Sequence, residues 1–465
     1  MENAADLKEK LFLKNKNFYL NTDEKTEKEI EEFSKGYKEF LNKNKTEREV
    51  VKNTIAYAKK FGFEEFDENK KYKAGDKIYI NNRGKAAIMA VIGKEKLENG
   101  LNIIASHADS PRLDLKQKPL YEDDGLALFK TQYYGGIKKY QWANVPLAIH
   151  GKICKSNGEE LDICIGEEEN EAKFIVSEIL IHLADAQMNK KVMKAIEGEQ
   201  LNILAGSKPF KDNKESDLIR LNILKLLNEK YGIIEEDLIS ADLYCVPAAK
   251  ASDIGFDASL VAAYGQDDKV CVYTSYKALL DYKANNKTAI AVFADKEEIG
   301  SCGNTGFDSN FVANFITKLC SNQNADFINT CKNSSCLSAD VTAAFDPNWP
   351  DVFDKKNCAY FNKGVSINKY TGGRGKGGSS EASAEFLFKV RNLLNKNNIP
   401  WQACTMGKVD IGGGGTVAKY VASLDIDVID LGVALLSMHS PVEISSKLDT
   451  YMLFKTYKAF FEQMK

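Results

Sequence analysis

The chain has 465 residues, 44% hydrophobic and 28% charged, which is enough for a large globular domain with a smaller one attached. Its 63 basic and 66 acidic residues give a net charge of −3, so nucleic acid and anionic membrane surfaces are not expected partners. The sequence shows no secretory signal, no apolar run near the roughly 18 residues of a membrane-spanning helix, and ten scattered cysteines without a CxxC pair, which together predict a cytoplasmic protein with free, mostly buried thiols.

The first predicted element is a long amphipathic helix over 24–62, where apolar residues recur at three- and four-residue spacing. Strands are predicted at 77–81, 86–92 and 101–106. The last two are nearly continuous apolar runs, as in sheets covered on both faces.

After Pro111 the pattern changes to short alternating segments over 115–180, which is typical of a compact β-rich unit. Farther along, we expect helices at 216–230, 308–320 and 380–396, and strands at 289–294, 400–406 and 427–433. The predicted fold class is therefore α/β: a mixed sheet with helices on both faces, formed by residues 1–112 and 251–465 and interrupted by a β-rich insertion at 113–250.

Acidic residues and histidines stand where the predicted strands stop or a helix begins. These are His107 and Asp109 in SHADSPR, Asp267 in GQDDKV, Glu297 and Glu298 in DKEEIGS, Asp340 in SADVTAAFD, and His439 in SMHSPVE. Because ligand sites of open α/β sheets form at the carboxyl ends of strands, we expect these segments to converge on one crevice.

Two histidines and several carboxylates suit a pair of divalent metal ions, most simply Zn²⁺, with Co²⁺ or Mn²⁺ as alternatives. One carboxylate must bridge the two ions, and a base must stand beside the bridging water. Neighbouring glutamates on an extended segment point in different directions, so one can bind metal while the other faces the water. Asp109 lies two residues from His107 and can accept the second ring N–H of that histidine.

Each of these patterns, taken alone, also fits a structural role, such as a helix cap, a turn or a solvated acidic pair. Their joint occurrence favours the metal site. Two glycine-rich stretches, TGGRGKGGSS at 371–380 and IGGGGTVAKY at 411–420, lack the order of residues of a phosphate-binding loop. We interpret them as loops where the backbone passes close to another group.

The quoted segments resemble the aspartyl aminopeptidase family, which is related to the tetrahedral aminopeptidases, and the resemblance covers nearly the whole chain. It implies that His107, Asp267 and Asp340 hold one metal, and that Asp267, Glu298 and His439 hold the other. Glu297 would be the general base and Asp109 would orient His107. The resemblance also implies a cis Asp267–Asp268 peptide and an inserted domain that forms dimers, which assemble into a tetrahedral dodecamer.

The implied activity is removal of N-terminal Asp or Glu from peptides with a free N-terminus. The resemblance assigns the cation of the substrate pocket to Lys369, with Arg374 or Lys376 as alternatives, and matches His150 to a histidine that the neighbouring subunit contributes. Lys296 and the glycine-rich loop at 369–380 depart from the family pattern and bring the acidic preference into question. His182 lies in an apolar run and is expected to pack internally.

Two other functions remain open. An aminopeptidase of broader or neutral specificity would use the same metal chemistry. A shell or assembly protein with incidental hydrolysis would keep the fold, but a degenerate site would then be expected, and every predicted ligand is present in this sequence.

Overall fold

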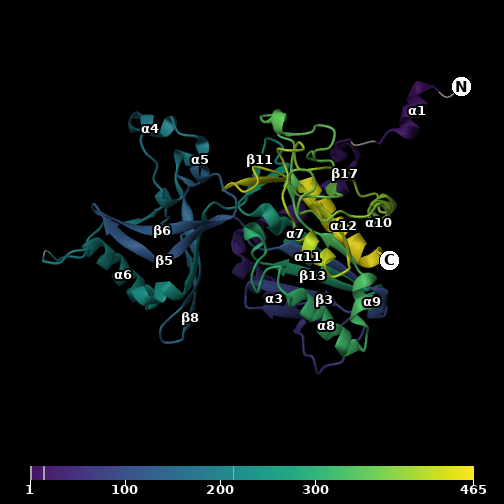
Figure 1. The fold of residues 1–465 in the computed structure, drawn as a ribbon, viewed down its shortest axis with the longest axis horizontal. Helices are drawn as coiled ribbons and strands as arrows, with labels where there is room; N and C mark the ends of the chain where they lie inside the picture. The colour runs from purple at the N-terminus through teal and green to yellow at the C-terminus, as the bar shows by residue number, and fades with distance from the viewer. Residues whose placement is uncertain (1–2, 14–15, 213) are drawn as a thin grey trace.

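The apolar runs at 86–92, 101–106 and 289–294 form the centre of a nine-stranded sheet (Figure 1). The structure is a computed structural model that describes residues 3–13, 16–212 and 214–465. In spatial order the strands are β1 Glu64–Glu65, β2 Lys77–Asn82, β3 Ala86–Val91, β13 Thr288–Ala294, β4 Leu101–His107, β14 Ser335–Ser338, β18 Asp427–Gly432, β16 Val365–Asn368 and β17 Trp401–Ala403.

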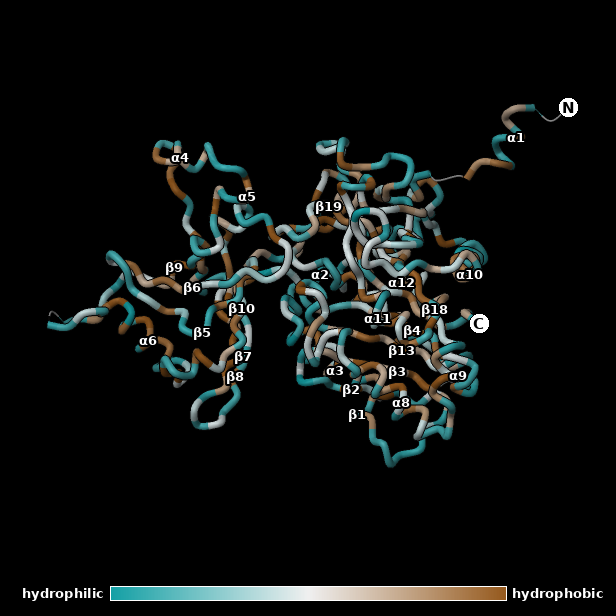
Figure 2. Tube along the Cα trace, in the orientation of Figure 1, coloured by the Kyte–Doolittle hydropathy of each residue, from teal (hydrophilic) through white to brown (hydrophobic). Residues whose placement is uncertain are grey.

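The four strands from β13 to β18 run parallel to one another, and β3 and β16 flank them in the antiparallel direction. Every residue of β3, β4 and β13 is buried, which explains their unbroken hydrophobicity along the chain (Figure 2). A smaller sheet of the same lobe has the order β11 Ser252–Ile254, β12 Leu260–Ala263, β20 Glu443–Ser446, β19 Ala434–Leu436 and β15 Thr342–Ala343.

Helices cover both faces of the large sheet, as predicted. One face packs against α2 Glu24–Lys43, α3 Glu47–Lys59, α7 Gln266–Asp281, α10 Ala384–Lys396 and α12 Lys447–Gln463. The other face packs against α8 Phe311–Gln323, α9 Phe327–Lys332 and α11 Ala418–Ala422. The short helix α1 Ala4–Leu11 projects away from both lobes (Figure 1).

The single helix expected over 24–62 is wrong in one respect, because it is broken at Asn44. Thr46 caps α3 by accepting a hydrogen bond from the Glu49 amide, and Glu49 accepts one from the Thr46 amide in return. The two apolar stripes of α2 and α3 have the same period, so the sequence pattern alone runs through the break.

A second lobe carries a six-stranded antiparallel sheet with its own apolar core. Its strands in spatial order are β8 Glu160–Ile165, β7 Leu147–Cys154, β10 Ala241–Pro247, β5 Arg112–Asp123, β6 Leu126–Tyr134 and β9 Ile203–Gly206. Three helices accompany it, α4 Asp185–Met188, α5 Val192–Ala195 and α6 Leu218–Tyr231. Residues 173–183, expected to alternate as a strand, form only two isolated bridges and a 3₁₀ turn, Ile181–Leu183.

All ten cysteines are free thiols and seven are buried, as predicted. None of the helices in the described part of the chain has the length and apolar character needed to cross a membrane.

Candidate metal centre

Parallel register brings the predicted strand-end residues to one edge of the large sheet. His107, the last residue of β4, pairs with Ala294, the last residue of β13. Ser338, the last residue of β14, pairs with Ala105 of β4. The segments that carry Glu297, Glu298 and Asp340 therefore leave the sheet beside His107.

Asp267 stands at the centre of this edge, at the start of α7. One of its carboxylate oxygens, Oδ1, lies 3.2 Å from His107 Nε2, and the other, Oδ2, lies 3.2 Å from His439 Nε2. Glu298 Oε2 lies 3.4 Å from the same His439 nitrogen. The Asp267–Asp268 peptide is cis, as the family resemblance implied.

Two triads of possible metal ligands meet at Asp267. His107, Asp267 and Asp340 form one group, and Asp267, Glu298 and His439 form the other, with the ligand atoms of each group within 4.8 Å of one another. Asp267 Oδ1 and Glu298 Oε1 are buried and accept no hydrogen bond within the described structure. Buried carboxylate oxygens need a compensating partner, and imidazole with carboxylate is a ligand set suited to zinc. The residues present therefore fit two divalent ions with Asp267 between them.

Burial and crowding of like charges separate the pKa values of the carboxyl groups. Burial, together with the nearby Asp109 and Asp267, raises the pKa of Glu297 to about 7 and moves that of Glu298 well above its usual range. Burial also opposes ionisation of Asp267, but the facing imidazoles of His107 and His439 hold the pKa of this carboxyl below its usual range. Within the two triads, ionisation is therefore favoured at Asp267, and the pKa of the adjacent Glu297 lies near neutrality.

Asp109 is completely buried and contacts the end of β4, the turn that carries Glu297 and Glu298, and strand β6. His107 Nδ1 lies 3.1 Å from its main-chain oxygen and 3.4 Å from its carboxylate Oδ1. The same carboxylate accepts hydrogen bonds from the amides of Glu297 and Glu298, each at 3.2 Å, and from the Tyr134 hydroxyl at 2.9 Å. The contact with His107 was expected, whereas the contacts with the glutamate turn were not.

Glu443 is a site residue that sequence reasoning missed. Its carboxylate is buried and accepts hydrogen bonds from the main-chain amides of His439, at 2.7 Å, and Asp267, at 3.0 Å. Burial raises the pKa of Glu443 to about 7. The only signal in the sequence was its position at the end of SMHSPVE, because the Asp267 amide lies 176 residues away along the chain.

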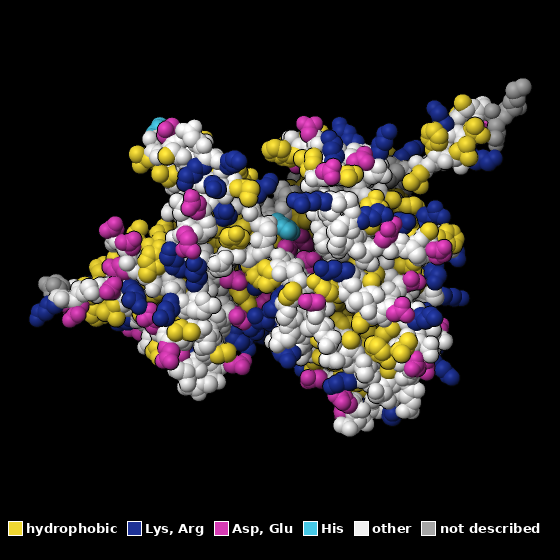
Figure 3. Space-filling view, in the orientation of Figure 1, with side chains coloured by type: hydrophobic (Ala, Val, Ile, Leu, Met, Phe, Trp, Pro, Cys, Tyr) yellow, Lys and Arg dark blue, Asp and Glu magenta, His cyan; other side chains and the backbone are white. Residues whose placement is uncertain are grey.

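The two triads of candidate ligands open into a cavity of roughly 830 Å³ at the side that faces the second lobe. Figure 3 shows a hollow between the lobes with acidic side chains and a histidine at its edge. Both glycine-rich stretches line this cavity, and Gly372 donates its amide to Gly414 O. A β-carbon on Gly413 would lie 2.0 Å from Gly372 O, so the two loops approach each other as closely as predicted.

Three further residues singled out in the sequence lie outside the two triads. Lys369 does not line the cavity, and its ammonium lies 3.6 Å from Glu381. His150 is 2% exposed, and both of its ring nitrogens face carboxylates of its own chain. His182 is exposed rather than packed, because the apolar run around it does not form a strand.

Comparisons with known proteins decide the family. Residues 40–461 match the family described as aminopeptidase I zinc metalloprotease (M18). The chain belongs to the M18 family of aminopeptidases. The family match covers both parts of the large lobe and the six-stranded sheet between them.

Individual M18 relatives agree over nearly their full lengths. A probable M18 family aminopeptidase 1 of Clostridium acetobutylicum is 50% identical over 461 residues, covering 96% of this chain and 97% of the relative. The crystal structure of an M18 aminopeptidase from Thermotoga maritima superposes with a TM-score of 0.93 at 42% identity, covering 97% of this chain and all of that one. The mApe1 dodecamer of S. cerevisiae shares the fold at a TM-score of 0.76 and 22% identity, covering 92% of this chain and 96% of that one.

Proposed function

We propose that this M18 aminopeptidase removes single N-terminal residues from peptides at a two-metal centre whose bridging ligand is Asp267. One observation carries the proposal: the two carboxylate oxygens of Asp267 face two separate groups of ligands. His107 and Asp340 would complete the first zinc site, and Glu298 and His439 the second.

The zinc ions, when bound, would polarise the scissile carbonyl and lower the pKa of a bound water. Glu297 would accept a proton from that water at its carboxylate and return it to the leaving amine. Its pKa of about 7, set mainly by burial, matches a group that must hold and release a proton near neutral pH. Asp109 would keep Glu297 in position through the hydrogen bond from the Glu297 amide.

A preference for acidic N-terminal residues is the narrower proposal. It requires a cation in the cavity to contact the acidic side chain of the substrate. Lys408 and Lys138 line the cavity, whereas Lys369 does not, so Lys408 or Lys138 would contact an Asp or Glu side chain. The same wall also carries Asp346, Asp354 and Asp410. These carboxylates offset the lysines and favour the second candidate, an aminopeptidase of broad or neutral specificity.

Turnover of chromogenic Asp, Glu, Leu, Lys and Ala substrates, after chelation and after return of Zn²⁺, Co²⁺ or Mn²⁺, tests both proposals. Metal-restored activity supports the two-metal mechanism, and absence of activity with every metal contradicts it.

If the acidic preference holds, Lys408→Met should lower kcat/KM for Asp and Glu by about tenfold or more, since hydrogen bonds to charged groups contribute ~1.5–3 kcal/mol. Lys369→Met is the matched control, and a main activity on Leu or Ala would contradict the acidic preference.

We also propose that the second lobe forms the dimer from which a dodecamer assembles. The assembly seen for S. cerevisiae mApe1 motivates this. Support comes from an exposed apolar run on the lobe, comprising Ile179, Leu180, Ile181, Leu183, Met188, Val192 and Met193. Leu183→Glu with Met193→Glu should reduce the sedimentation coefficient, whereas Phe388→Glu on the exposed face of α10 should not. An unchanged assembly in the first variant would contradict the proposal.

A further inference from the structure

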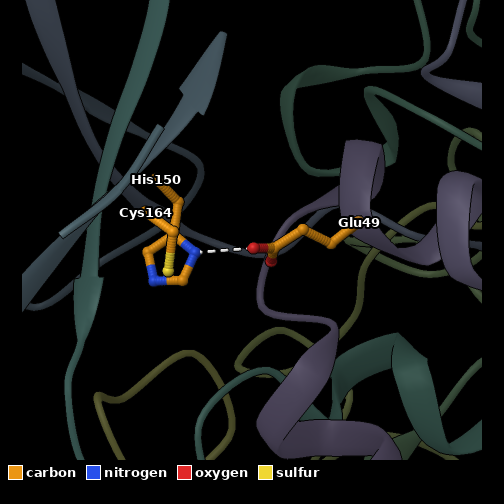
Figure 4. Close-up of side chains that lie close together, drawn as sticks. All are labelled: Glu49, His150 and Cys164. Atoms are coloured by element: carbon orange, nitrogen blue, oxygen red, sulfur yellow. Dashed lines mark hydrogen bonds and ion pairs between the residues drawn. The ribbon is translucent and has the colours of Figure 1, made fainter. Parts of the chain in front are cut away.

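A second cluster of side chains able to bind metal shares no residue with the proposed catalytic centre and lies where the first lobe meets the second. Glu49 projects from the first turn of α3, and His150 and Cys164 project from the paired strands β7 and β8 (Figure 4). The oxygen, nitrogen and sulfur ligand atoms lie within 4.8 Å of one another. We propose that these three side chains form a structural site for one Zn²⁺ ion that clamps the two lobes together.

The strand register explains why the two ligands of the second lobe coincide. His150 and Cys164 are directly opposite each other in the antiparallel pair, so their side chains lie on the same face of the sheet. Glu49 reaches this face from α3, with its Oε1 atom 2.7 Å from His150 Nδ1. Thiolate, imidazole and carboxylate are all zinc ligands, and a water molecule can supply the fourth position.

The surroundings of His150 match the usual support of a metal-bound histidine. Its second ring nitrogen, Nε2, lies 3.0 Å from Glu167 Oε1. A buried carboxylate in this position accepts the N–H of a ligating imidazole and leaves the opposite nitrogen free for the metal. Glu167 is itself fixed by Lys45 at 2.6 Å and Lys250 at 2.7 Å.

Charge balance permits the exchange of protons for metal. Binding of Zn²⁺ would release the proton held between His150 and Glu49 and the thiol proton of Cys164, so the net charge of the cluster would not change. Three of the cations that line the adjacent cavity are already paired: Arg48 with Asp242, Lys52 with Asp162, and Lys152 with Glu160. The distance from Glu49 Oε1 to His150 Nδ1 would widen to about 3.3 Å, as tetrahedral bonds of about 2.0 Å require.

A cavity also gives a metal ion access to these ligands. A cavity of roughly 520 Å³ is lined by Glu49 and Cys164, together with Gly151 and Lys152 of β7. Cys164 is exposed, whereas His150 is buried behind it. Metal bound here would join α3 to the β7–β8 pair and would fix the angle between the lobes.

Titration of the metal-free full-length chain with Co²⁺ tests the site, because bound thiolate gives cobalt a charge-transfer absorption in the near ultraviolet. The proposed catalytic centre contains no cysteine, so its ions cannot produce this signal. We expect the band in the wild type and in Cys154→Ser, whose exposed thiol at the end of β7 is the matched control. Cys164→Ser should abolish the band, and zinc content should fall by one ion per chain relative to the wild type.

Glu49→Gln provides a second variant that preserves the fold, since glutamine can still complete the capping box of α3. It should weaken cobalt binding at the thiolate site by about tenfold or more. Absence of the band in the wild type would overturn the proposal. So would a band that survives Cys164→Ser or is lost in Cys154→Ser. None of these outcomes depends on whether the proposed aminopeptidase mechanism is correct.

Discussion

At the proposed catalytic centre, some residues would bind the metals and one would transfer protons. Glu297 and Glu298 are neighbours in the chain, yet only Glu298 lies near His439 and accepts no hydrogen bond at its second oxygen. Both amides donate hydrogen bonds to Asp109, which fixes the turn that carries the two side chains. The same pair of residues can therefore supply a base and a ligand.

Glu297→Gln should lower kcat by about 10²- to 10⁴-fold, because glutamine cannot accept the proton from the attacking water. Metal content measured by mass spectrometry should remain at the wild-type level. Glu298→Gln is the matched comparison and should lose metal together with activity. Loss of metal in Glu297→Gln would show that Glu297 is a ligand and that the division of roles is wrong.

Glu443→Gln should weaken metal binding by about 10- to 100-fold, the usual effect of removing a group that orients ligands. The amide can accept a hydrogen bond from His439 or Asp267 but not from both main-chain amides at its two former oxygens. Competition with a chelator measures the affinity. Saturating metal should restore kcat, and failure to restore it would contradict a positioning role.

Asp430, which is not among the proposed metal ligands, provides a pH dependence of stability. Burial raises its pKa to about 6, and Thr416 donates a hydrogen bond to it. Because the folded state holds this proton more tightly than the unfolded chain does, the stability it contributes is present below about pH 4 and is lost as pH rises through 6. The wild type should therefore lose thermal stability over this range.

Asp430→Asn should flatten that dependence, since asparagine does not ionise. Asp427→Asn, at the exposed start of the same strand, should leave it unchanged. Thermal unfolding midpoints at several pH values between 4 and 8 provide the measurement. Equal slopes for the wild type and Asp430→Asn would refute the assignment.

Whole elements meet at the site because strands β14 and β18 pack tightly where they end. Gly432 closes β18, and a β-carbon there would lie 1.9 Å from Asp340 O. This contact fixes the backbone that carries the Asp340 carboxylate. The position of a proposed ligand thus depends on the absence of a side chain on the neighbouring segment.

Gly432→Ala should displace Asp340 and reduce the metal content and the activity together. Gly373→Ala is the control, because a β-carbon on Gly373 would meet nothing within 4 Å. Metal content per chain and turnover are measured on the same preparations. Full metal content in Gly432→Ala would mean that the strands adjust without moving the ligand.

The sequence predicted some secondary-structure elements and candidate ligands and missed others. The parallel strands, and His107, Glu297, Glu298 and Asp340 at or just beyond their ends, were predicted because a buried parallel strand has a distinct composition and ends at a known edge. The break at Asn44 was missed because both helices share one apolar period. Glu443 was missed, and the surroundings of Lys369 and His150 were not predictable, because they depend on distant backbone and on loop paths that no local pattern records.

At the scale of the whole molecule, a buried cluster of charged and aromatic side chains connects the two lobes. Arg112, at the start of β5, lies between the rings of Tyr134 and Tyr244 at 4.1 and 3.8 Å from their centres. Its guanidinium pairs with Glu47 of α3 at 3.0 Å. One charged side chain therefore connects the first lobe to three strands of the second.

Arg112→Met should destabilise the chain by about 3–5 kcal/mol, because it leaves the buried Glu47 carboxylate without its partner. Lys152→Met removes ion pairs to exposed carboxylates and should cost only about 0–1 kcal/mol. Urea unfolding followed by fluorescence gives the comparison. A similar small loss in both variants would show that the buried cluster between the lobes contributes little.

The second lobe also contacts the proposed metal centre, since Tyr134 donates a hydrogen bond to Asp109 and the Gly136 carbonyl accepts one from His439 Nδ1 at 2.9 Å. A chimaera that exchanges the inserted lobe between two family members would consequently transfer part of the catalytic geometry along with the assembly surface. Grafts joined beyond residue 136 retain the recipient's own contacts. Grafts joined at residue 112 inherit the donor's, and their activity then depends on whether donor and recipient are compatible at these two positions.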